Sequence, residues 1–352
     1  MHRSLESIGF SSFFQTAFDA LSPPQGVPAR VTWAQADRAQ LLGAEGDFEA
    51  MVPRTLRSAG AVVVAGDWVS VDRTRGVVAR VLPRRTEFVR QAAGRRLERQ
   101  IVAANVDIVF LLAGLDGDFN PRRLERYLAL ARASGASPVL LLTKAALCAD
   151  VAAREAEAKA LAGGAPVHAI DVVAGVGVEA PRRYLEPGVS VALIGSSGVG
   201  KSTLINHLIG HEGSATGPVR EYDARGRHTT TWRELFFLPS GAALLDTPGM
   251  REVQLWCDPA GLDEAFDDLA SLSSGCRFRD CRHGDEPGCA LRAAIERGEL
   301  EPARLASFEG LRREVEAHAG RQVERARHEK ERGRGMQKLL RSALRQKYGR
   351  GG

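Results

Sequence analysis

A glycine-rich segment, Gly195 to Thr203, constrains the fold of this chain more than any other feature. It follows the apolar run 189–194, and the stretch 202–208 after it has helical spacing of apolar residues. This is the strand, loop and helix order in which the pattern G-x-x-x-x-G-K-[ST] binds phosphate. Backbone N–H groups at such a helix N-terminus converge on phosphate oxygens. A chance glycine-rich loop would not account for the lysine, the serine and the flanking strand together.

A second motif, Asp-Thr-Pro-Gly, begins at Asp246 after another apolar run, 242–245. Lys201 is expected to neutralise terminal phosphates, and the Ser202 hydroxyl and Asp246 to hold Mg²⁺. Between the motifs, Thr230 lies in the segment 226–232, whose hydroxyls can reach Mg²⁺ and the terminal phosphate as a switch does. The residues predicted here to bind nucleotide are Gly195, Ser196, Ser197, Gly198, Val199, Gly200, Lys201, Ser202, Thr203, Asp246 and Gly249.

The order of the motifs is unusual. A candidate base-recognition segment containing Thr143 and Lys144 precedes the phosphate loop, whereas in the usual arrangement it follows. Apolar strand-like segments at 106–112 and 138–142 alternate with a helical segment at 122–133, which favours a parallel sheet covered by helices. We therefore predict a circularly permuted nucleotide-binding domain whose switch region, around Asp246, runs directly into the C-terminal part.

Three of the five cysteines cluster with a histidine: Cys276, Cys281, His283 and Cys289. Their spacing lets a loop fold around a tetrahedral, structural Zn²⁺ with no open coordination position. The alternative, free thiols in a core, fits poorly with the charged residues between them. Cys148 and Cys257 are expected to pack as small hydrophobic residues.

Composition is that of a globular protein, with 44% hydrophobic and 26% charged residues. No apolar run reaches the roughly 18 to 20 residues that span a bilayer, and the N-terminus has no secretion pattern. A clustered rather than paired use of cysteine indicates a reducing compartment. The expected protein is cytoplasmic, with no membrane contact, and monomeric by default.

These features together resemble one family. The permuted motif order, the segment 226–231, the Asp-Thr-Pro-Gly motif and the cysteine cluster resemble the RsgA/YjeQ circularly permuted GTPases of small-ribosomal-subunit assembly. Further matching segments lie at 66–69, 82–86, 103–107 and 120–127. The resemblance implies an OB-fold barrel in the β-rich stretch that contains the apolar runs 61–64, 68–71 and 76–81, an rRNA partner, and His228 as the residue that orients the attacking water. A plain packing module is the alternative for the barrel.

Two positions depart from the family pattern. The base segment [NT]-K-x-D usually ends in an Asp that accepts guanine N1–H and the exocyclic amine, and here Ala146 takes its place. Asp171 and Val172 align with the later Ser-Ala segment, so base specificity is in doubt. Asp171 either contacts the base or is a surface or helix-capping carboxylate, and sequence leaves both open.

The position after Asp-Thr-Pro-Gly is Met250, where Ras-like enzymes have a water-orienting Gln. The imidazole of His228 can accept a hydrogen bond from water near neutral pH, and the resemblance assigns it that role. A histidine in a polar loop is otherwise a bystander or an RNA contact. The predicted catalytic residues are His228, Lys201 and Thr230.

The predicted fold is multidomain α/β, with an N-terminal OB-fold barrel, a permuted P-loop GTPase domain and a C-terminal zinc-binding helical domain. The expected boundaries are 1–28 extension, 29–97 barrel, 98–258 GTPase domain, 259–320 zinc domain and 321–352 basic tail. The tail is either an RNA contact or a solvated segment. The predicted function is hydrolysis of GTP to GDP and phosphate with Mg²⁺, one Zn²⁺ per chain, and a role in late maturation of the small ribosomal subunit. The alternative is an rRNA-binding assembly factor with vestigial or relaxed-specificity hydrolysis.

Overall fold

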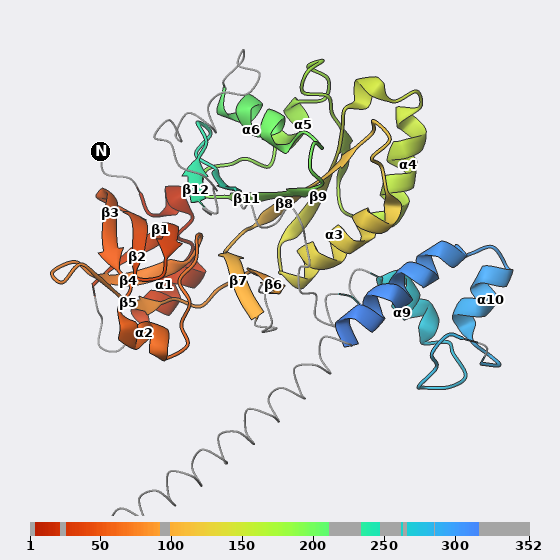
Figure 1. The fold of residues 1–352 in the computed structure, drawn as a ribbon, viewed down its shortest axis with the longest axis horizontal. Coiled ribbons are helices and arrows are strands. Elements are labelled where there is room, and N and C mark those ends of the chain that lie inside the picture. Colours follow the sequence, from red (N-terminus) through yellow and green to blue (C-terminus); the bar gives the residue numbers. More distant parts are fainter. Residues whose placement is uncertain are drawn as a thin grey trace, which may run out of the picture.

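The computed structural model describes residues 4–21, 26–91, 99–210, 234–246, 262, 266–284 and 286–316. Figure 1 shows a small barrel, an α/β part built around a central sheet, and C-terminal helices beside α3. No helix in the described part of the chain is both long and apolar enough to cross a bilayer.

The barrel is a closed five-stranded sheet. Its strands are β1 (Val27–Gln35), β2 (Arg38–Gly43), β3 (Gly46–Met51), β4 (Trp68–Asp72) and β5 (Val77–Val81), with α2 (Arg54–Ser58) between β3 and β4. The strand order is β1-β2-β3-β5-β4, and β4 pairs back to β1. Small and β-branched residues such as Ala29, Val31 and Val69 fill the interior. This closure confirms the predicted OB-like barrel.

One predicted strand of the barrel is wrong. Residues 61–64 form no strand, although three valines there favour one. The Asp67 carboxylate accepts the Val64 backbone N–H at 2.9 Å, and the Asp67 N–H donates to the Val64 carbonyl. Arg84 pairs with Asp67 at 2.7 Å and holds the carboxylate in place. The run is therefore irregular, and a turn at residues 65–66 leads from it into β4.

The N-terminal segment packs on the barrel, although the sequence assigned it no element. It contains a 3₁₀ turn, Glu6–Ile8, and α1 (Ser12–Asp19). The rings of Phe10 and Phe14 lie 4.7 and 5.8 Å from the buried Trp68 ring, centroid to centroid. The aromatic residues that look scattered in sequence thus share one face and bury a common cluster.

A strand pairing and a buried cation join the barrel to the α/β part, since β1 pairs with β12 (Glu234–Phe237) of the central sheet and Arg30 of β1 lies between the two parts. Arg30 of β1 donates to the Ile8 carbonyl at 2.6 Å, the Asn105 carbonyl at 3.2 Å and the Ser190 hydroxyl. Burial lowers the pKa of Arg30 to about 10 against the opposing pull of Asp107, so it remains charged at neutral pH. The hairpin of β6 (Glu87–Gln91) and β7 (Arg99–Ala104) connects the two parts along the chain.

The central sheet has the order β10-β9-β8-β11-β13-β12. Its strands are β8 (Ile108–Gly114), β9 (Ser137–Thr143), β10 (Val167–Ala169), β11 (Ser190–Gly195), β12 (Glu234–Phe237) and β13 (Ala243–Asp246). All neighbours pair in parallel except β12, which is antiparallel to β13. The strand that carries the phosphate loop, β11, is thus central but enters after three strands of its own sheet. This topology confirms the circular permutation.

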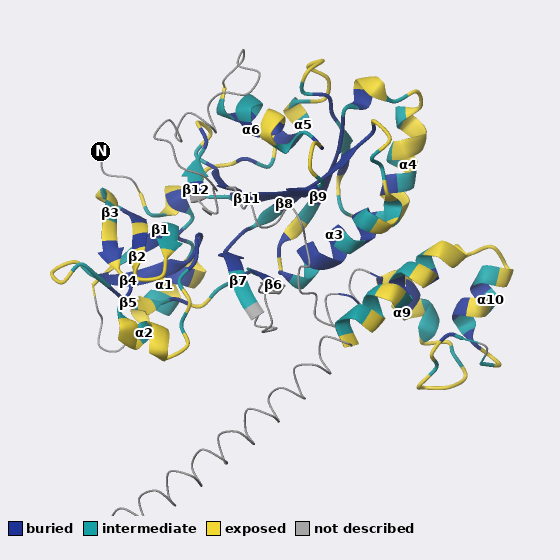
Figure 2. Ribbon diagram, viewed as in Figure 1, coloured by how far each residue is buried: buried dark blue, intermediate teal, exposed yellow. Residues whose placement is uncertain are grey.

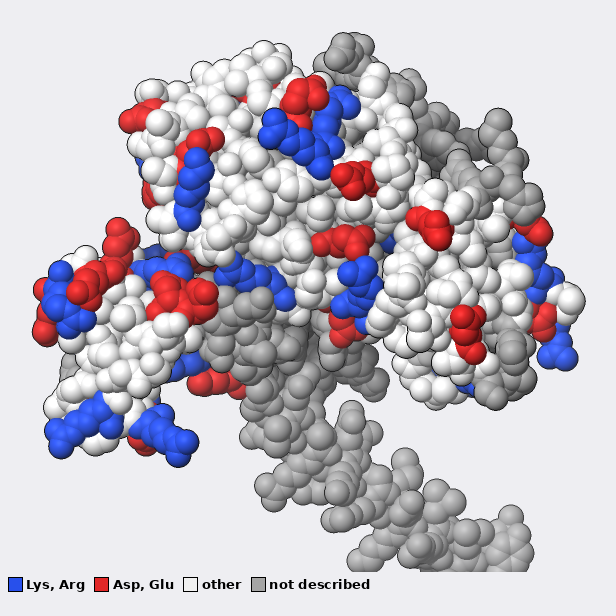
Figure 3. Space-filling view, turned by 180° about the vertical axis from the view of Figure 1, so that it is seen from behind, with Lys and Arg blue, Asp and Glu red and all other residues white. Residues whose placement is uncertain are grey.

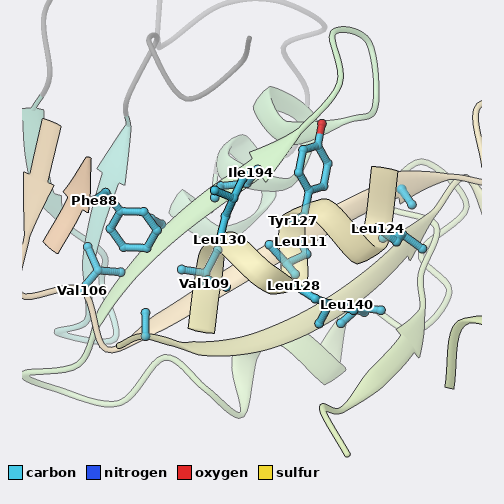
Figure 4. Packing of buried hydrophobic residues seen from close by; sticks show 14 of the residues in the cluster. Phe88, Val106, Val109, Leu111, Leu124, Tyr127, Leu128, Leu130, Leu140 and Ile194 are labelled. Carbon is cyan, nitrogen blue, oxygen red and sulfur yellow. The ribbon is translucent and has the colours of Figure 1, made fainter. Parts of the chain in front are cut away.

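Alternating strand residues divide the core of the sheet into two. Val109 and Leu111 face α3 (Pro121–Ala133) and α4 (Val151–Leu161), while Phe110 and Leu112 face α6 (Lys201–Ile209) and the segment after α5 (Glu179–Arg182). Figure 4 shows Leu124 and Leu128 of α3 over the strands, and Figure 2 shows the strands buried between the helical layers. Because both faces are covered, the strands read as continuous apolar runs, as the sequence predicted.

The C-terminal helices pack against α3. They comprise α9 (Asp267–Ser273), α10 (Ala290–Glu296) and the helical residues 302–316, around a core that includes Phe266, Leu291 and Ala129 of α3. Arg304 donates to Glu125 of α3 at 2.9 Å and makes two bonds of 2.7 Å to Asp268 of α9. The nucleotide domain and the C-terminal helices thus share one ion-pair network, buried at Glu125 and exposed at Asp268.

Arg304→Ala is expected to loosen this packing. The Arg304 and Glu125 side chains are 14% and 4% exposed, so the change leaves a buried carboxylate without its cation, at a cost of about 3–5 kcal/mol. Hydrogen exchange should become faster in α9 and in the Glu125 turn of α3, while β11 keeps its protection. Arg126→Ala is the matched control, because the Arg126–Glu314 pair is about one-third exposed and is expected to contribute less than about 1 kcal/mol. Equal effects of the two variants would contradict this account.

Candidate nucleotide and metal sites

The phosphate loop joins β11 to α6 with the backbone that its glycines require. Gly198 and Gly200 have φ values of +75° and +100°, and Gly200 caps α6. A Cβ on Gly195 would lie 2.8 Å from the Leu112 carbonyl oxygen, so the loop also needs glycine for close packing. The Lys201 ammonium donates to the carbonyls of Gly195 and Ser196 at 2.6 and 2.5 Å. The phosphate loop therefore curves around the Lys201 ammonium and holds it by its own backbone carbonyls.

The other loop residues present polar groups at the start of α6. Ser197, Gly198, Ser202 and Thr203 are exposed, whereas Val199 is buried and anchors the loop in the core. Asp246 ends β13, the strand that pairs with β11 through Ala192 and Leu245. The strand order thus brings the Asp246 backbone to the same edge of the sheet as the phosphate loop.

The base-recognition segment lies beside the phosphate loop. The buried Thr143 hydroxyl donates to the Val199 carbonyl at 2.7 Å, which joins the two segments directly. Lys144 has a left-handed backbone, with φ of +60°, and its ammonium pairs with Asp116. A non-glycine residue in this conformation stores strain of the kind found at functional sites. The permuted motifs, far apart and reversed in the chain, therefore meet in space.

Asp171 lies beside Ala146, the residue that takes the place of the usual Asp in the base segment. Its side chain accepts the Ala146 backbone N–H at 3.1 Å and the Ala174 N–H at 2.9 Å, and the residue is 6% exposed. Asp171 is thus no surface carboxylate, and its bond to Ala146 caps the first turn of the 3₁₀ helix Ala145–Leu147. The contact between Asp171 and Ala146 could not be predicted from the sequence, because the two residues are 25 positions apart in the chain.

Two further acidic residues of the site were missed from the sequence. Asp116 and Asp118 follow β8 at the carboxyl edge of the sheet. The Lys144 ammonium holds the pKa of Asp116 below its usual value by a hydrogen bond. Asp118 accepts from the Ser196 hydroxyl of the phosphate loop and pairs with Arg123 at 2.7 Å. A signal was present, because polar residues just after a parallel strand line the edge where ligands bind.

The predicted switch lies outside the described residues. His228, Thr230, Gly249 and Met250 belong to it, and the same is true of the Asp246 side chain and Cys257. Their assigned roles stay predictions.

The cysteine cluster is assembled as predicted. The ligand atoms of Cys276, Cys281, His283 and Cys289 lie within 4.8 Å of one another. The His283 Nδ1 is 3.8 Å from the Cys276 sulfur and 3.6 Å from the Cys289 sulfur. Such separations suit four ligands around one ion at 2.0 to 2.3 Å. His283 also has a left-handed backbone, with φ of +61°, which turns the chain back towards the thiols.

The chemistry of the donors suits a metal ion. A backbone hydrogen bond at His283 lowers the pKa of Cys281, but burial and the neighbouring sulfurs of Cys289 and Cys276 outweigh it and raise this pKa to about 11. Three adjacent thiols cannot all ionise without a cation between them, and a bound Zn²⁺ supplies one. Among the described residues this is the grouping of side chains able to hold a metal.

Fold and site together define a circularly permuted P-loop nucleotide-binding protein with a metal-binding C-terminal part. Residues 81–256 match the RsgA GTPase family. The chain is 45% identical over 339 residues to a protein of Opitutus terrae named small ribosomal subunit biogenesis GTPase RsgA, covering 91% of this chain and 92% of the relative. It is 50% identical over 265 residues to the protein of the same name from Xylella fastidiosa strain M23, covering 74% and 78%. The chain belongs to the RsgA GTPase family.

Solved structures agree with this fold. The crystal structure of YjeQ from Thermotoga maritima has a TM-score of 0.62 at 24% identity, covering 82% of this chain and 98% of that one. YloQ, described as a circularly permuted GTPase, has a TM-score of 0.56 at 23% identity, covering 83% and 95%. At these identities the likeness shows the fold alone.

Proposed function

We propose that this chain hydrolyses GTP with Mg²⁺ and assists late maturation of the small ribosomal subunit. The observation that carries the proposal is the joined site, in which Thr143 of the base segment binds the Val199 carbonyl of the phosphate loop. Family membership and the printed names of the relatives support the same reading. We also propose that the protein is cytoplasmic, because clustered cysteines without a disulfide framework are typical of reducing compartments.

The roles of the site residues follow from their positions. The loop N–H groups and Lys201 would hold the terminal phosphates. Thr143 and Lys144, which Thr143 holds against the phosphate loop, would contact the nucleotide on its base side. Mg²⁺ would be held by Ser202, Thr230 and Asp246, and when bound it neutralises charge that develops on the phosphates. His228 would orient the attacking water, because the Met250 thioether is only a weak hydrogen-bond acceptor.

The C-terminal cluster would hold one structural Zn²⁺ through Cys276, Cys281, His283 and Cys289. A closed set of four ligands leaves no position for substrate, so the metal supplies folding energy rather than catalysis. Through Arg304 the zinc domain packs on α3 of the nucleotide domain. We infer that a monomer places both parts on the subunit together.

RNA contact is supported by the distribution of charge. Residues 317–352 hold eleven Lys and Arg against three Glu, a net charge of +8, so the rest of the chain sums to −3 within the total of +5. On the face in Figure 3, the described positive and negative side chains are interspersed. We propose that the basic tail attracts rRNA, with the barrel adding a nucleic-acid face typical of its fold.

The proposal is tested by turnover of GTP, ATP and XTP with and without purified small ribosomal subunits. We expect GTP to be hydrolysed, faster when subunits are present, and ATP and XTP to be hydrolysed more slowly. Subunit binding without turnover of any nucleotide would favour the alternative, an assembly factor with vestigial hydrolysis. Rapid ATP turnover without stimulation by subunits would contradict the proposal.

A further inference from the structure

We propose that Asp171 supplies the carboxylate that reads the guanine edge, in place of the Asp that Ala146 has replaced. The inference rests on the proposed GTP site and adds a specificity-determining residue to it. It also changes the sequence expectation, because Ala146 alone predicts a site with weakened base selection.

The backbone brings Asp171 to the base segment. β10 pairs with β9 in register, with Ala169 opposite Leu142. The pairing continues past the strand ends, because the Ile170 N–H donates to the Leu142 carbonyl at 2.8 Å and the Ala145 N–H donates to the Ile170 carbonyl at 3.2 Å. Asp171 and Ala146 are therefore neighbours just beyond the ends of β10 and β9. They lie at the carboxyl edge of the sheet, where ligands of such sheets bind.

The carboxylate is fixed before any ligand arrives. One oxygen of Asp171 accepts from Ala146 and the other from Ala174, and the backbones of Asp171 and Val176 exchange two hydrogen bonds of 2.8 and 2.9 Å. An ionised carboxylate offers about four acceptor positions, so each oxygen keeps capacity for one more donor. Two adjacent free acceptor positions match two adjacent donors on a ligand.

Exposed apolar side chains lie on the same loops as this carboxylate and Ala146. Eight large hydrophobic residues are exposed in the described part of the chain. Three of them lie in the loops after β9 (144–150) and β10 (170–178): Leu147 at 69%, Val173 at 91% and Val176 at 53%. Apolar groups gathered on loops beside a buried polar group are typical of a site for a flat, partly apolar ligand. A purine base has that character.

The chemistry selects guanine. Guanine presents N1–H and an exocyclic amine side by side, and each can donate to one Asp171 oxygen. Adenine presents an acceptor at N1, and xanthine presents a carbonyl where guanine has the amine. An acceptor that faces a buried carboxylate loses a hydrogen bond and leaves the charge unpaired, which is why such sites discriminate strongly.

Calorimetric titration with GDP, XDP and ADP in the presence of Mg²⁺ tests the proposal. Wild-type protein should bind GDP roughly 10- to 150-fold more tightly than XDP, the range expected for a charge-assisted hydrogen bond. Asp171→Asn should reverse the preference, since an amide N–H can donate to the xanthine carbonyl. Asp72→Asn is the matched control, because Asp72 also binds two loop N–H groups, those of Thr74 and Arg75, but on the barrel.

A second variant separates recognition from loop stability. Ala146→Asp combined with Asp171→Asn returns a carboxylate to the usual position. The preference of this double variant for GDP over XDP should be at least about tenfold greater than that of the single Asp171→Asn variant. Equal loss of GDP, XDP and ADP in Asp171→Asn, with no recovery in the double variant, would assign Asp171 a structural role only. Wild-type protein that binds the three nucleotides equally overturns the Asp171 proposal alone. Protein that binds none overturns the nucleotide site as well, and selective GDP binding without GTP turnover overturns only the proposed hydrolysis.

Discussion

Lys201→Ala should lower kcat/KM for GTP by about 100- to 1,000-fold, the loss typical of removing one preorganised group that stabilises transition-state charge. The Lys201 ammonium already sits inside the phosphate loop on the carbonyls of Gly195 and Ser196. Phosphoryl transfer depends almost entirely on positioning and charge neutralisation, so no other described group substitutes for it. Single-turnover hydrolysis with and without small subunits measures the effect.

The control for this variant is Lys159→Ala. Lys159 is a surface lysine of α4 that pairs with Glu155 at 3.1 Å and is more than half exposed. Its removal should leave hydrolysis unchanged within about twofold, because exposed pairs contribute little. If Lys201→Ala also stays within about threefold of wild type, the loop does not act on the terminal phosphates and its assigned role fails.

Local patterns in the sequence were sufficient to predict four strands of the central sheet, β8, β9, β11 and β13, but not the short strands β10 and β12. The predicted strand at 189–194 and helix at 202–208 correspond to β11 and α6 within one residue at each end. Two rules act together there, since buried parallel strands are continuously apolar and a phosphate loop must join a strand to a helix. The spacing of Cys276, Cys281, His283 and Cys289 was equally informative, because ligands so close in sequence need only one loop to meet.

Contacts between distant segments could not be read from the chain. The valines at 61–64 favour a strand locally, but the Asp67 side chain competes for their backbone and turns it. Phe10 and Phe14 show no pattern in the sequence, because the residue on which they pack, Trp68, lies more than fifty positions away in the chain. The Asp171 carboxylate meets Ala146 only because β10 pairs with β9. In each case tertiary pairing decided what local propensity left open.

Removal of the metal from the cluster of Cys276, Cys281, His283 and Cys289 should unfold the C-terminal helices and leave the nucleotide domain folded. Structural zinc supplies about 10–16 kcal/mol of apparent binding free energy in small zinc domains at neutral pH, which acts as folding free energy. The core of α9 and α10 is small and includes Cys289 itself, whereas the central sheet has two separate cores of its own. Hydrogen exchange before and after chelation should therefore show lost protection in α9 and α10 and retained protection in β8 and β11.

Metal content and one substitution make this expectation specific to the cluster. Natively purified protein should contain one zinc per chain, and Cys281→Ser should lower that content and weaken subunit binding more than GDP binding. Cys148→Ser is the control, because Cys148 is a half-buried thiol that packs at the edge of the sheet core, away from the four ligands. The coupling through Arg304 adds a second consequence: once the helical residues 302–316 unfold, Glu125 loses its cation, and the Glu125 turn of α3 should exchange faster even though the nucleotide site keeps its affinity. Zinc-free protein that retains full protection in α10 would show that the four side chains pack without a metal.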